Sequence, residues 1–202
     1  MDLLTFNLAS SHQHGPAFYN YLKLRKRHFV DVLNWDIPHD EMVEMDQYDT
    51  PQAWYACVAQ NGQVIGGARV MPTTAAWGAH SYMLGDAYCG HIPGIPQDAM
   101  PHNIRTAKVW ECTRLVITPD LRRRDIRARC LELICNGLIS IAHMHGATDL
   151  ITLTRMPLMR TLRSLGFDVT AVGAPYTSPE DGHRYAVMGM PAVLNHTALA
   201  AE

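Results

Sequence analysis

One segment decides how the middle of the chain folds: Trp54-Tyr55-Ala56-Cys57-Val58-Ala59-Gln60-Asn61-Gly62-Gln63-Val64-Ile65-Gly66-Gly67-Ala68-Arg69-Val70. Two apolar, β-prone runs flank Asn61-Gly62, and this dipeptide favours a tight turn because both residues tolerate positive φ. The segment therefore predicts a hairpin of antiparallel strands at 54–59 and 64–70. Arg69 is the one charge in the second strand, and a buried arginine usually pairs with a carboxylate or an anionic ligand.

The residues before and after this hairpin differ in regularity. Upstream, Phe18, Leu22, Phe29 and Leu33 recur at steps of four, seven and four, which predicts a helix over about 16–34. Downstream, residues 72–104 are rich in Gly, Pro and His and predict a long irregular excursion with a helical turn near Met83-Leu84.

The second half of the chain alternates between strand and helix patterns. A β-prone run at 108–117 predicts a central strand, and helical spacing follows over 121–145 until Gly146 stops it. The remaining patterns predict a strand at 150–153, a helix at 156–165, and strands at 167–172 and 184–190. A β-α-β unit joined to a hairpin is a mixed α/β sandwich.

Composition limits the class of protein. A chain of 202 residues with 48% hydrophobic and 18% charged residues predicts one globular domain, 1–202, with a core at about 16–190 and a short flexible tail at 192–202. A net charge of -2 gives no reason to expect nucleic acid or an anionic membrane as partner. The start lacks the positive flank of a signal peptide, so we expect a cytoplasmic protein. Five cysteines without C-x-x-C spacing predict reduced, buried thiols and no metal site.

Four charged residues are candidates for chemistry. Glu111 and Arg114 lie three apart in one strand, so they face opposite sides unless a bulge intervenes, and each needs a partner or a cleft. A structural ion pair is the alternative. Asp46 and Asp49 belong to an acidic turn, for which a solvated loop or a helix cap is the alternative.

Arginines gather at the start of the helix predicted over 121–145. Five arginines and one aspartate lie between Leu121 and Arg129, a local charge of +4. Cations oppose the helix dipole at an N-terminus, so the cluster favours an anionic partner there. Arginine outnumbers lysine fourteen to three in the whole chain, so compositional bias is the alternative explanation.

A series of short segments runs in a familiar order along the chain. The series is Leu24-Arg25-Lys26-Arg27-His28-Phe29-Val30-Asp31-Val32-Leu33-Asn34-Trp35, Glu44-Met45-Asp46-Gln47-Tyr48-Asp49, Gly66-Gly67-Ala68-Arg69-Val70-Met71-Pro72-Thr73, Tyr82-Met83-Leu84 and Trp110-Glu111-Cys112-Thr113-Arg114. Over about residues 20–190 the chain resembles the acyl-homoserine-lactone synthases, the LuxI-type autoinducer synthases of bacterial quorum sensing.

The resemblance implies a fold and a reaction. The fold is that of GNAT-like N-acyltransferases, an α/β class with a mixed, mostly antiparallel sheet and helices on both faces. The reaction joins the amino group of S-adenosylmethionine to an acyl group carried as a thioester on acyl carrier protein or coenzyme A. Lactone closure then releases methylthioadenosine, and no cofactor takes part.

The resemblance also implies roles for particular residues. The positions that shape the S-adenosylmethionine pocket are Arg25, Phe29, Trp35, Asp46, Asp49 and Arg69, and the catalytic positions are Glu111 and Arg114. An α-amino group with a pKa of about 8 is mostly protonated at pH 7, so Glu111, directly or through water, is the candidate base. Arg69 and Arg114 are candidates for holding carboxylate or phosphopantetheine oxygens, and Asp46 for the substrate ammonium.

The chain departs from the family pattern in the acyl-donor half. The acyl pocket is expected at Met83, Tyr88, Ile151 and Thr152, with Tyr88 where the family usually has Phe. Ile151 stands where synthases of 3-oxo products often have Thr, which favours an unsubstituted or hydroxylated chain. Related acetyltransferases bind pyrophosphate on a glycine-rich turn, and here arginines occupy that place. We therefore expect the acyl donor to dock on Arg122, Arg123, Arg124 and Arg127.

Two other functions fit parts of the pattern. A GNAT-like acyltransferase that uses acyl-coenzyme A on another amine would not need Trp35, Asp46 or Asp49. A non-catalytic acyl- or nucleotide-binding regulator would not need Glu111 and Arg114, since a binding module has no use for a base beside a thioester.

Overall fold

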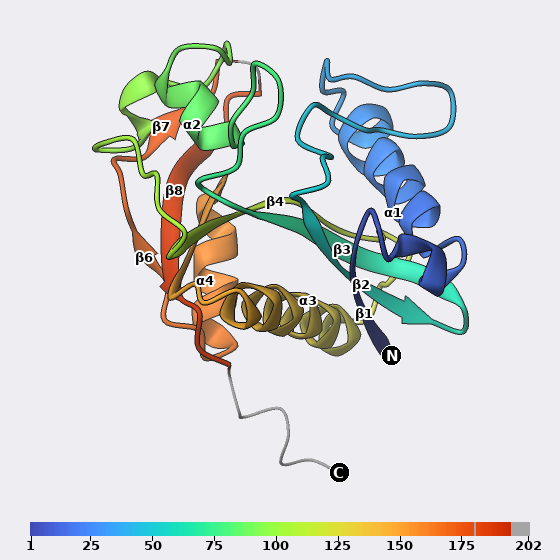
Figure 1. Ribbon diagram of the computed structural model, residues 1–202. Helices are drawn as coiled ribbons and strands as arrows, with labels where there is room; N and C mark the ends of the chain where they lie inside the picture. Colours follow the sequence, from blue (N-terminus) through green and yellow to red (C-terminus); the bar gives the residue numbers. More distant parts are fainter. Residues whose placement is uncertain (180, 195–202) are drawn as a thin grey trace. The chain divides into compact units, whose positions relative to one another are not determined.

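The computed structural model describes residues 1–179 and 181–194 (Figure 1). The chain divides into two compact units, which are described one at a time. The first comprises Met1–Val70 and Thr113–Ile141, and the second comprises Met71–Cys112 and Ala142–Glu202.

The first unit contains the predicted hairpin. Strands β2 (Trp54–Gln60) and β3 (Gln63–Pro72) pair antiparallel, which confirms the prediction, and the turn residues Asn61 and Gly62 have φ values of 51° and 76°. The strand order in this unit is β1-β2-β3-β4, with β4 spanning Val109–Ile117. Strand β1 (Asp2–Asn7), which the sequence reading did not foresee, pairs antiparallel with β2.

The helix expected over 16–34 is two different structures. After a short 3-10 helix (η1, Ser11–His14), the first of them is the α-helix α1 (Ala17–Arg25). The chain continues as a π-helix (η2) over Lys26–Val32, where for example the Leu33 N–H donates to the carbonyl of His28, five residues back. The prediction of a single α-helix over 16–34 was therefore wrong. Short π-helical segments are rare and often occur at functional sites.

Adjacent glycines let helices pack on both faces of β3 in the first unit. Successive strand residues point to opposite faces. A Cβ atom on Gly66 would lie 2.9 Å from the Cys130 sulfur of helix α3 (Arg124–Met144), and one on Gly67 would lie 2.9 Å from the ring of Tyr21 in α1. The helices thus approach the strand more closely than any side chain there would allow.

The second unit is built around parallel pairing of the start of β4 with β5 (Asp149–Arg155), which confirms the β-α-β prediction. The order is β4-β5-β8-β6, and all the pairings of β8 are antiparallel. The remaining elements are α2 (Met83–Tyr88), η3 (Gln97–Ala99), α4 (Met156–Ser164), β6 (Thr170–Ala171), β7 (Tyr176–Thr177) and β8 (Arg184–Pro191).

Several smaller predictions can be compared with the structure. All five cysteines are free, and four are buried, but Cys89 is exposed. Burial raises the pKa of Cys130 to about 11 and that of Cys135 to about 12, so these thiols are unreactive near neutral pH. In the predicted tail, Ala192 is buried and its N–H donates to the Thr148 carbonyl, whereas 195–202 lie outside the described residues.

No helix within 1–179 and 181–194 has the length and apolar character of a membrane span. In the same part of the chain no group of three or more His, Cys, Asp and Glu side chains is placed to hold a metal ion.

The contact between β3 and α1 can be tested at Gly67. Gly67→Ala places a methyl group against the buried Tyr21 ring, so we expect a loss of about 1–3 kcal/mol in the free energy of unfolding. Denaturant unfolding measures this free energy. The control is Gln63→Ala, at an exposed position of the same strand, where we expect little change. Equal midpoints for the two variants would contradict the packing described.

Candidate active site

Arg25 ends helix α1 with its side chain fully buried. Its Nε donates to Glu44 Oε2 at 2.6 Å, and its two terminal nitrogens donate to the two oxygens of Asp49 at 2.9 Å each. A paired, two-point contact of this kind fixes the plane and direction of both groups. Arg25 therefore ties the helix to the loop that carries Glu44 and Asp49.

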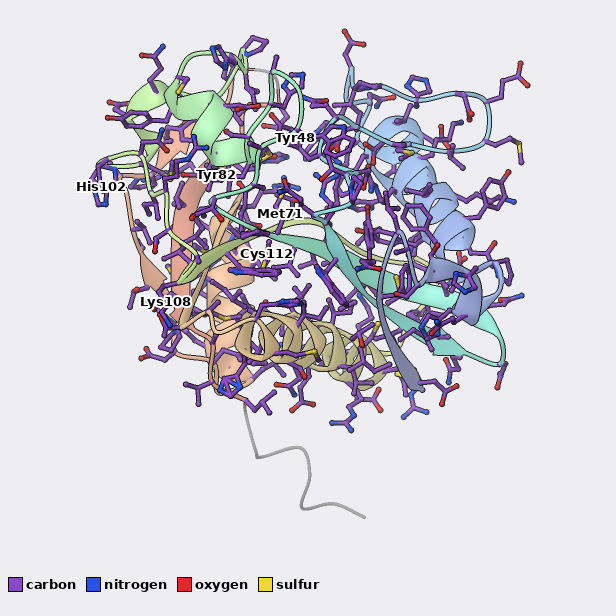
Figure 2. The ribbon with its side chains drawn as sticks, in the orientation of Figure 1. Tyr48, Met71, Tyr82, His102, Lys108 and Cys112 are labelled. Atoms are coloured by element: carbon purple, nitrogen blue, oxygen red, sulfur yellow. The ribbon has the colours of Figure 1, made fainter. Side chains whose placement is uncertain are left out.

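Arg69 of β3 binds the same loop from the sheet. Its Nη1 lies 2.5 Å from Asp46 Oδ1 and 2.9 Å from Asp49 Oδ1, and its Nε donates to the Thr113 hydroxyl at 3.0 Å. The guanidinium also lies 5.6 Å from the ring centre of Tyr48, which is labelled in Figure 2. The expectation that Arg69 is buried beside a carboxylate is confirmed, and the solvated-loop alternative for the two aspartates is wrong.

Arg114 of β4 completes the group. Its Nη2 lies 2.7 Å from Asp46 Oδ2, and its Nε lies 3.2 Å from Glu44 Oε1. We call the six side chains the charge network: Arg25, Glu44, Asp46, Asp49, Arg69 and Arg114. Three guanidinium groups face three carboxylates, so the network is electrically balanced.

The two aspartates of the network keep their charges at neutral pH. Burial by itself would raise the pKa of Asp46, but Arg69 and Arg114 outweigh it and lower that pKa below its usual value. Burial would also raise the pKa of Asp49, but the charges of Arg69 and Arg25 lower it by more than burial raises it. Because both pKa values are depressed, the stabilisation is complete above the normal carboxylate pKa of about 4 and is lost as the pH falls below it.

An aromatic pair lies against this network. The π-helix η2 carries Phe29, whose ring is 5.5 Å from the Arg114 guanidinium. Trp35 stacks on Phe29 at 5.0 Å between ring centres, and the Trp35 N–H donates to the Phe29 carbonyl at 2.9 Å. Phe29 is buried and Trp35 is half-buried. The structure thus brings together all six residues that the resemblance assigns to the S-adenosylmethionine pocket.

Glu111 belongs to the second unit and has a structural task of its own. Its carboxylate is fully buried, and its two oxygens accept hydrogen bonds from the N–H groups of Met83 and Leu84 at 2.9 Å each. Those N–H groups open helix α2, directly after Tyr82 (Figure 2), and lack helical acceptors of their own. Glu111 therefore caps α2 from strand β4.

The predicted acyl-pocket residues all lie in the second unit. Ile151 is directly opposite Glu111 in the parallel β4–β5 pairing, and Met83 is bonded to Glu111 through its backbone. Tyr88 ends the same helix, half-buried, and Thr152 points to the other face of β5 from Ile151. A cavity of about 290 Å³ is lined by Ile151 but by none of the other three, and Asp149 and Asp168 also line it.

The arginine cluster at the start of α3 is exposed except at one position. Arg122, Arg123 and Arg124 are exposed, and Arg123 pairs with Asp125 at 2.5 Å. Arg127 is half-buried, and its Nη1 donates to the carbonyls of Thr118 and Leu121. Arg127 thus holds the turn before the helix, whereas the exposed members present charge to solvent.

The sequence reading missed three contributors to these sites. Glu44 bonds both Arg25 and Arg114, and it stood in the quoted acidic turn without being chosen. The Tyr55 hydroxyl donates to Asp49 at 2.9 Å. In the second unit, buried Asp86 accepts hydrogen bonds from the Ser81 N–H and hydroxyl, which gives α2 a second anchor beside Glu111.

Known proteins resemble this chain along most of its length. The sequence profile of the autoinducer synthase family matches residues 11–193. An acyl-homoserine-lactone synthase of Acinetobacter nosocomialis is 30% identical over 169 residues, which cover 79% of this chain and 85% of that protein. TofI, crystallised with an inhibitor and MTA, is 25% identical with a TM-score of 0.73 and covers 95% of this chain and 92% of its own.

More distant structures share the fold. BjaI, a CoA-dependent acyl-homoserine lactone synthase solved with SAM and isopentyl-CoA, has a TM-score of 0.77 at 17% identity, over 95% of this chain and 83% of its own. An acyl-CoA N-acyltransferase from Pseudomonas aeruginosa has a TM-score of 0.56 at 16% identity, over 94% and 97%. These likenesses confirm the expected GNAT-like class, a mixed and mostly antiparallel sheet with helices. The chain belongs to the autoinducer synthase family.

Proposed function

We propose that the chain is an acyltransferase that joins an acyl group to S-adenosylmethionine and releases an acyl-homoserine lactone as a quorum-sensing signal. The observation that carries the proposal is the charge network, because it joins the buried Arg25, Asp46, Asp49 and Arg69 to the half-buried Arg114. The relative that is 30% identical is an acyl-homoserine-lactone synthase, and TofI binds MTA, which supports the same reaction.

The reaction has two balanced steps. The α-amine of S-adenosylmethionine loses a proton and attacks the thioester carbonyl, so that a C–N bond forms, the C–S bond breaks and the thiol leaves with a proton. The methionyl carboxylate then attacks its own γ-carbon, which breaks the bond to the sulfonium sulfur and frees neutral methylthioadenosine. Both substrates are consumed, and the proposal includes no cofactor or metal.

The geometry refines the roles in the first step. The carboxylates of the charge network already face arginines, so their charges are largely compensated before any substrate binds. We assign the network to shaping the pocket wall and to aiming Arg114 rather than to neutralising the substrate ammonium alone. Phe29 and Trp35 offer stacked aromatic faces, which attract a sulfonium cation as they attract other cations.

Glu111 remains the proposed base, which takes the proton of the substrate amine directly or through water. Because its carboxylate also caps α2, it holds Met83 beside the position where the acyl group is expected. The acyl chain would lie against Met83, Tyr88, Ile151 and Thr152. Base and acyl pocket are thereby coupled through one side chain.

The acyl donor is either acyl carrier protein or acyl-coenzyme A, and both are polyanionic. BjaI was solved with isopentyl-CoA, but at 17% identity that structure supports the shared fold and does not choose a donor here. The exposed arginines at the start of α3 are the proposed docking surface, because an anionic partner offsets their unfavourable interaction with the helix dipole. We place the protein in the cytoplasm, where both donors are made.

The proposal as a whole is tested in cells. Organic extracts of cells that express the chain are compared with extracts of cells carrying an empty vector, by mass spectrometry. We expect one or more acyl-homoserine lactones only in the expressing cells, and the fragment masses identify the acyl chain. Extracts without any such lactone, from cells that contain folded protein, would overturn the proposal.

The role of Glu111 predicts a large kinetic effect. Glu111→Gln keeps the size of the side chain and one acceptor for the α2 N–H groups but removes the base, so we expect turnover to fall about 100- to 10,000-fold. S-adenosylmethionine affinity, measured by calorimetry, stays within a few-fold of wild type. Turnover unchanged at saturating substrate would exclude Glu111 as the base.

The charge network predicts an effect on substrate binding. Asp46→Asn removes one of three carboxylates and leaves Arg69 and Arg114 less well compensated, so we expect weaker S-adenosylmethionine binding and lower stability. Calorimetry and denaturant unfolding measure the two effects. The control is Asp40→Asn, at an exposed carboxylate that accepts hydrogen bonds from the Met42 and Val43 N–H groups. Wild-type affinity in folded Asp46→Asn would show that the network does not shape the pocket.

The docking surface is tested at its exposed members. Arg122→Glu with Arg124→Glu leaves the bonds of Arg127 intact, so we expect a higher KM for the acyl donor and an unchanged KM for S-adenosylmethionine. The control is Lys23→Glu with Arg184→Glu, which changes the net charge equally at exposed sites elsewhere. Donor KM should also rise with salt, since exposed charges are screened beyond about 8 Å at physiological ionic strength. Equal donor KM in both double variants would place docking elsewhere.

A further inference from the structure

Arg114 has an unusual backbone conformation. Its φ is 55°, in the left-handed region, although it lies within strand β4. In the described part of the chain the other non-glycine residues with positive φ are Asn34 and Asn61, and asparagine adopts this conformation far more readily than arginine. Such a conformation persists only when the surrounding structure holds the residue in it.

Three contacts hold this point of β4 in the first unit. The guanidinium of Arg114 is bound by Asp46 and Glu44, and the neighbouring Thr113 hydroxyl accepts from Arg69. The third contact is to the backbone itself: the Tyr21 hydroxyl donates to the Arg114 carbonyl at 2.9 Å. A residue in the left-handed conformation turns its carbonyl out of the regular strand pattern, so this oxygen needs a hydrogen-bond donor from outside the sheet.

Tyr21 is built into its place. It is fully buried, and its ring occupies the space left by the missing side chain of Gly67. The Arg25 guanidinium, one helical turn away, lies 5.5 Å from the ring centre. Burial raises the pKa of the Tyr21 phenol far above its normal value, so the hydroxyl stays protonated and remains a donor.

We propose that Tyr21 is a positioning residue of the synthase site: its hydroxyl holds the Arg114 carbonyl, and this keeps Arg114 in the conformation that aims its guanidinium at Asp46 and Glu44. The inference rests on the proposed function, which places Arg114 beside the reacting groups. Without the hydroxyl, the Arg114 carbonyl loses this donor and the left-handed conformation loses one of its restraints. The backbone of Arg114 then relaxes toward the extended conformation, and its side chain is no longer held in one orientation.

The test removes only the hydroxyl. Tyr21→Phe keeps the ring against Gly67 and beneath Arg25, so the fold is retained. The Nε–H signal of Arg114 in nitrogen-15 NMR, assigned by its loss in Arg114→Lys, reports the orientation of the side chain. We expect this signal to shift or broaden in Tyr21→Phe, while the signal of Arg27, an exposed arginine paired with Asp120, stays unchanged.

Kinetics supply the second measurement. We expect kcat/KM for lactone formation to fall about tenfold in Tyr21→Phe. The matched control is Tyr185→Phe, which removes a hydroxyl bonded to Asp181 at 2.7 Å in the other unit and leaves both the Arg114 signal and kcat/KM at wild-type values.

The outcomes separate the two hypotheses. An Arg114 signal at its wild-type position in Tyr21→Phe overturns the positioning role, even if stability or activity falls, because Tyr21 then contributes packing alone. A shifted signal in a protein whose wild type makes no lactone supports the positioning role and contradicts the proposed function. A shifted signal together with reduced kcat/KM supports both.

Discussion

The structure of the first unit depends on one constraint: charges that are taken out of water must be paired. Two arginines and three carboxylates are buried together, with the half-buried Arg114 bound to them, and breaking such a group by removing one partner costs about 3–5 kcal/mol. Each arginine comes from a different element, α1, β3 or β4, and all three reach the loop that carries Glu44, Asp46 and Asp49. The network therefore fixes that loop against the helix and the sheet, and it sets the position of Arg114 and the aromatic pair beside it.

The same constraint on buried charge applies to Glu111 in the second unit. A buried carboxylate must accept hydrogen bonds, and here the donors are the first N–H groups of α2. The helix is short, and Glu111 and Asp86 together hold its start. A side chain proposed as the base of an acyltransferase is in this way also the support of the segment expected to line the acyl pocket. The proposed roles thus link catalysis and acyl-chain selection through a single residue.

Much of this arrangement could be predicted from the sequence, and the failures have physical reasons. Asn61-Gly62 and the helical spacing before Gly146 are local signals, so the hairpin, the central strand and the long helix were predicted correctly. Strand β1 was missed because its pairing with β2 depends on residues some fifty positions away. The π-helix was missed because its apolar spacing resembles that of an α-helix over so few residues. The isolated Arg69 correctly indicated a carboxylate partner. The ion pairs of Glu44 and the cap that Glu111 supplies to α2 depend on tertiary contacts, which residue spacing does not show.

The central claim is that this member of the autoinducer synthase family couples acylation of S-adenosylmethionine to lactone closure. The most direct measurement incubates the purified protein with S-adenosylmethionine carrying carbon-13 in its methionyl part, together with an acyl thioester, and quantifies products by mass spectrometry. We predict labelled acyl-homoserine lactone and methylthioadenosine in equal amounts. Consumption of the thioester to acylate a different amine, with S-adenosylmethionine left intact and no methylthioadenosine formed, would contradict the account.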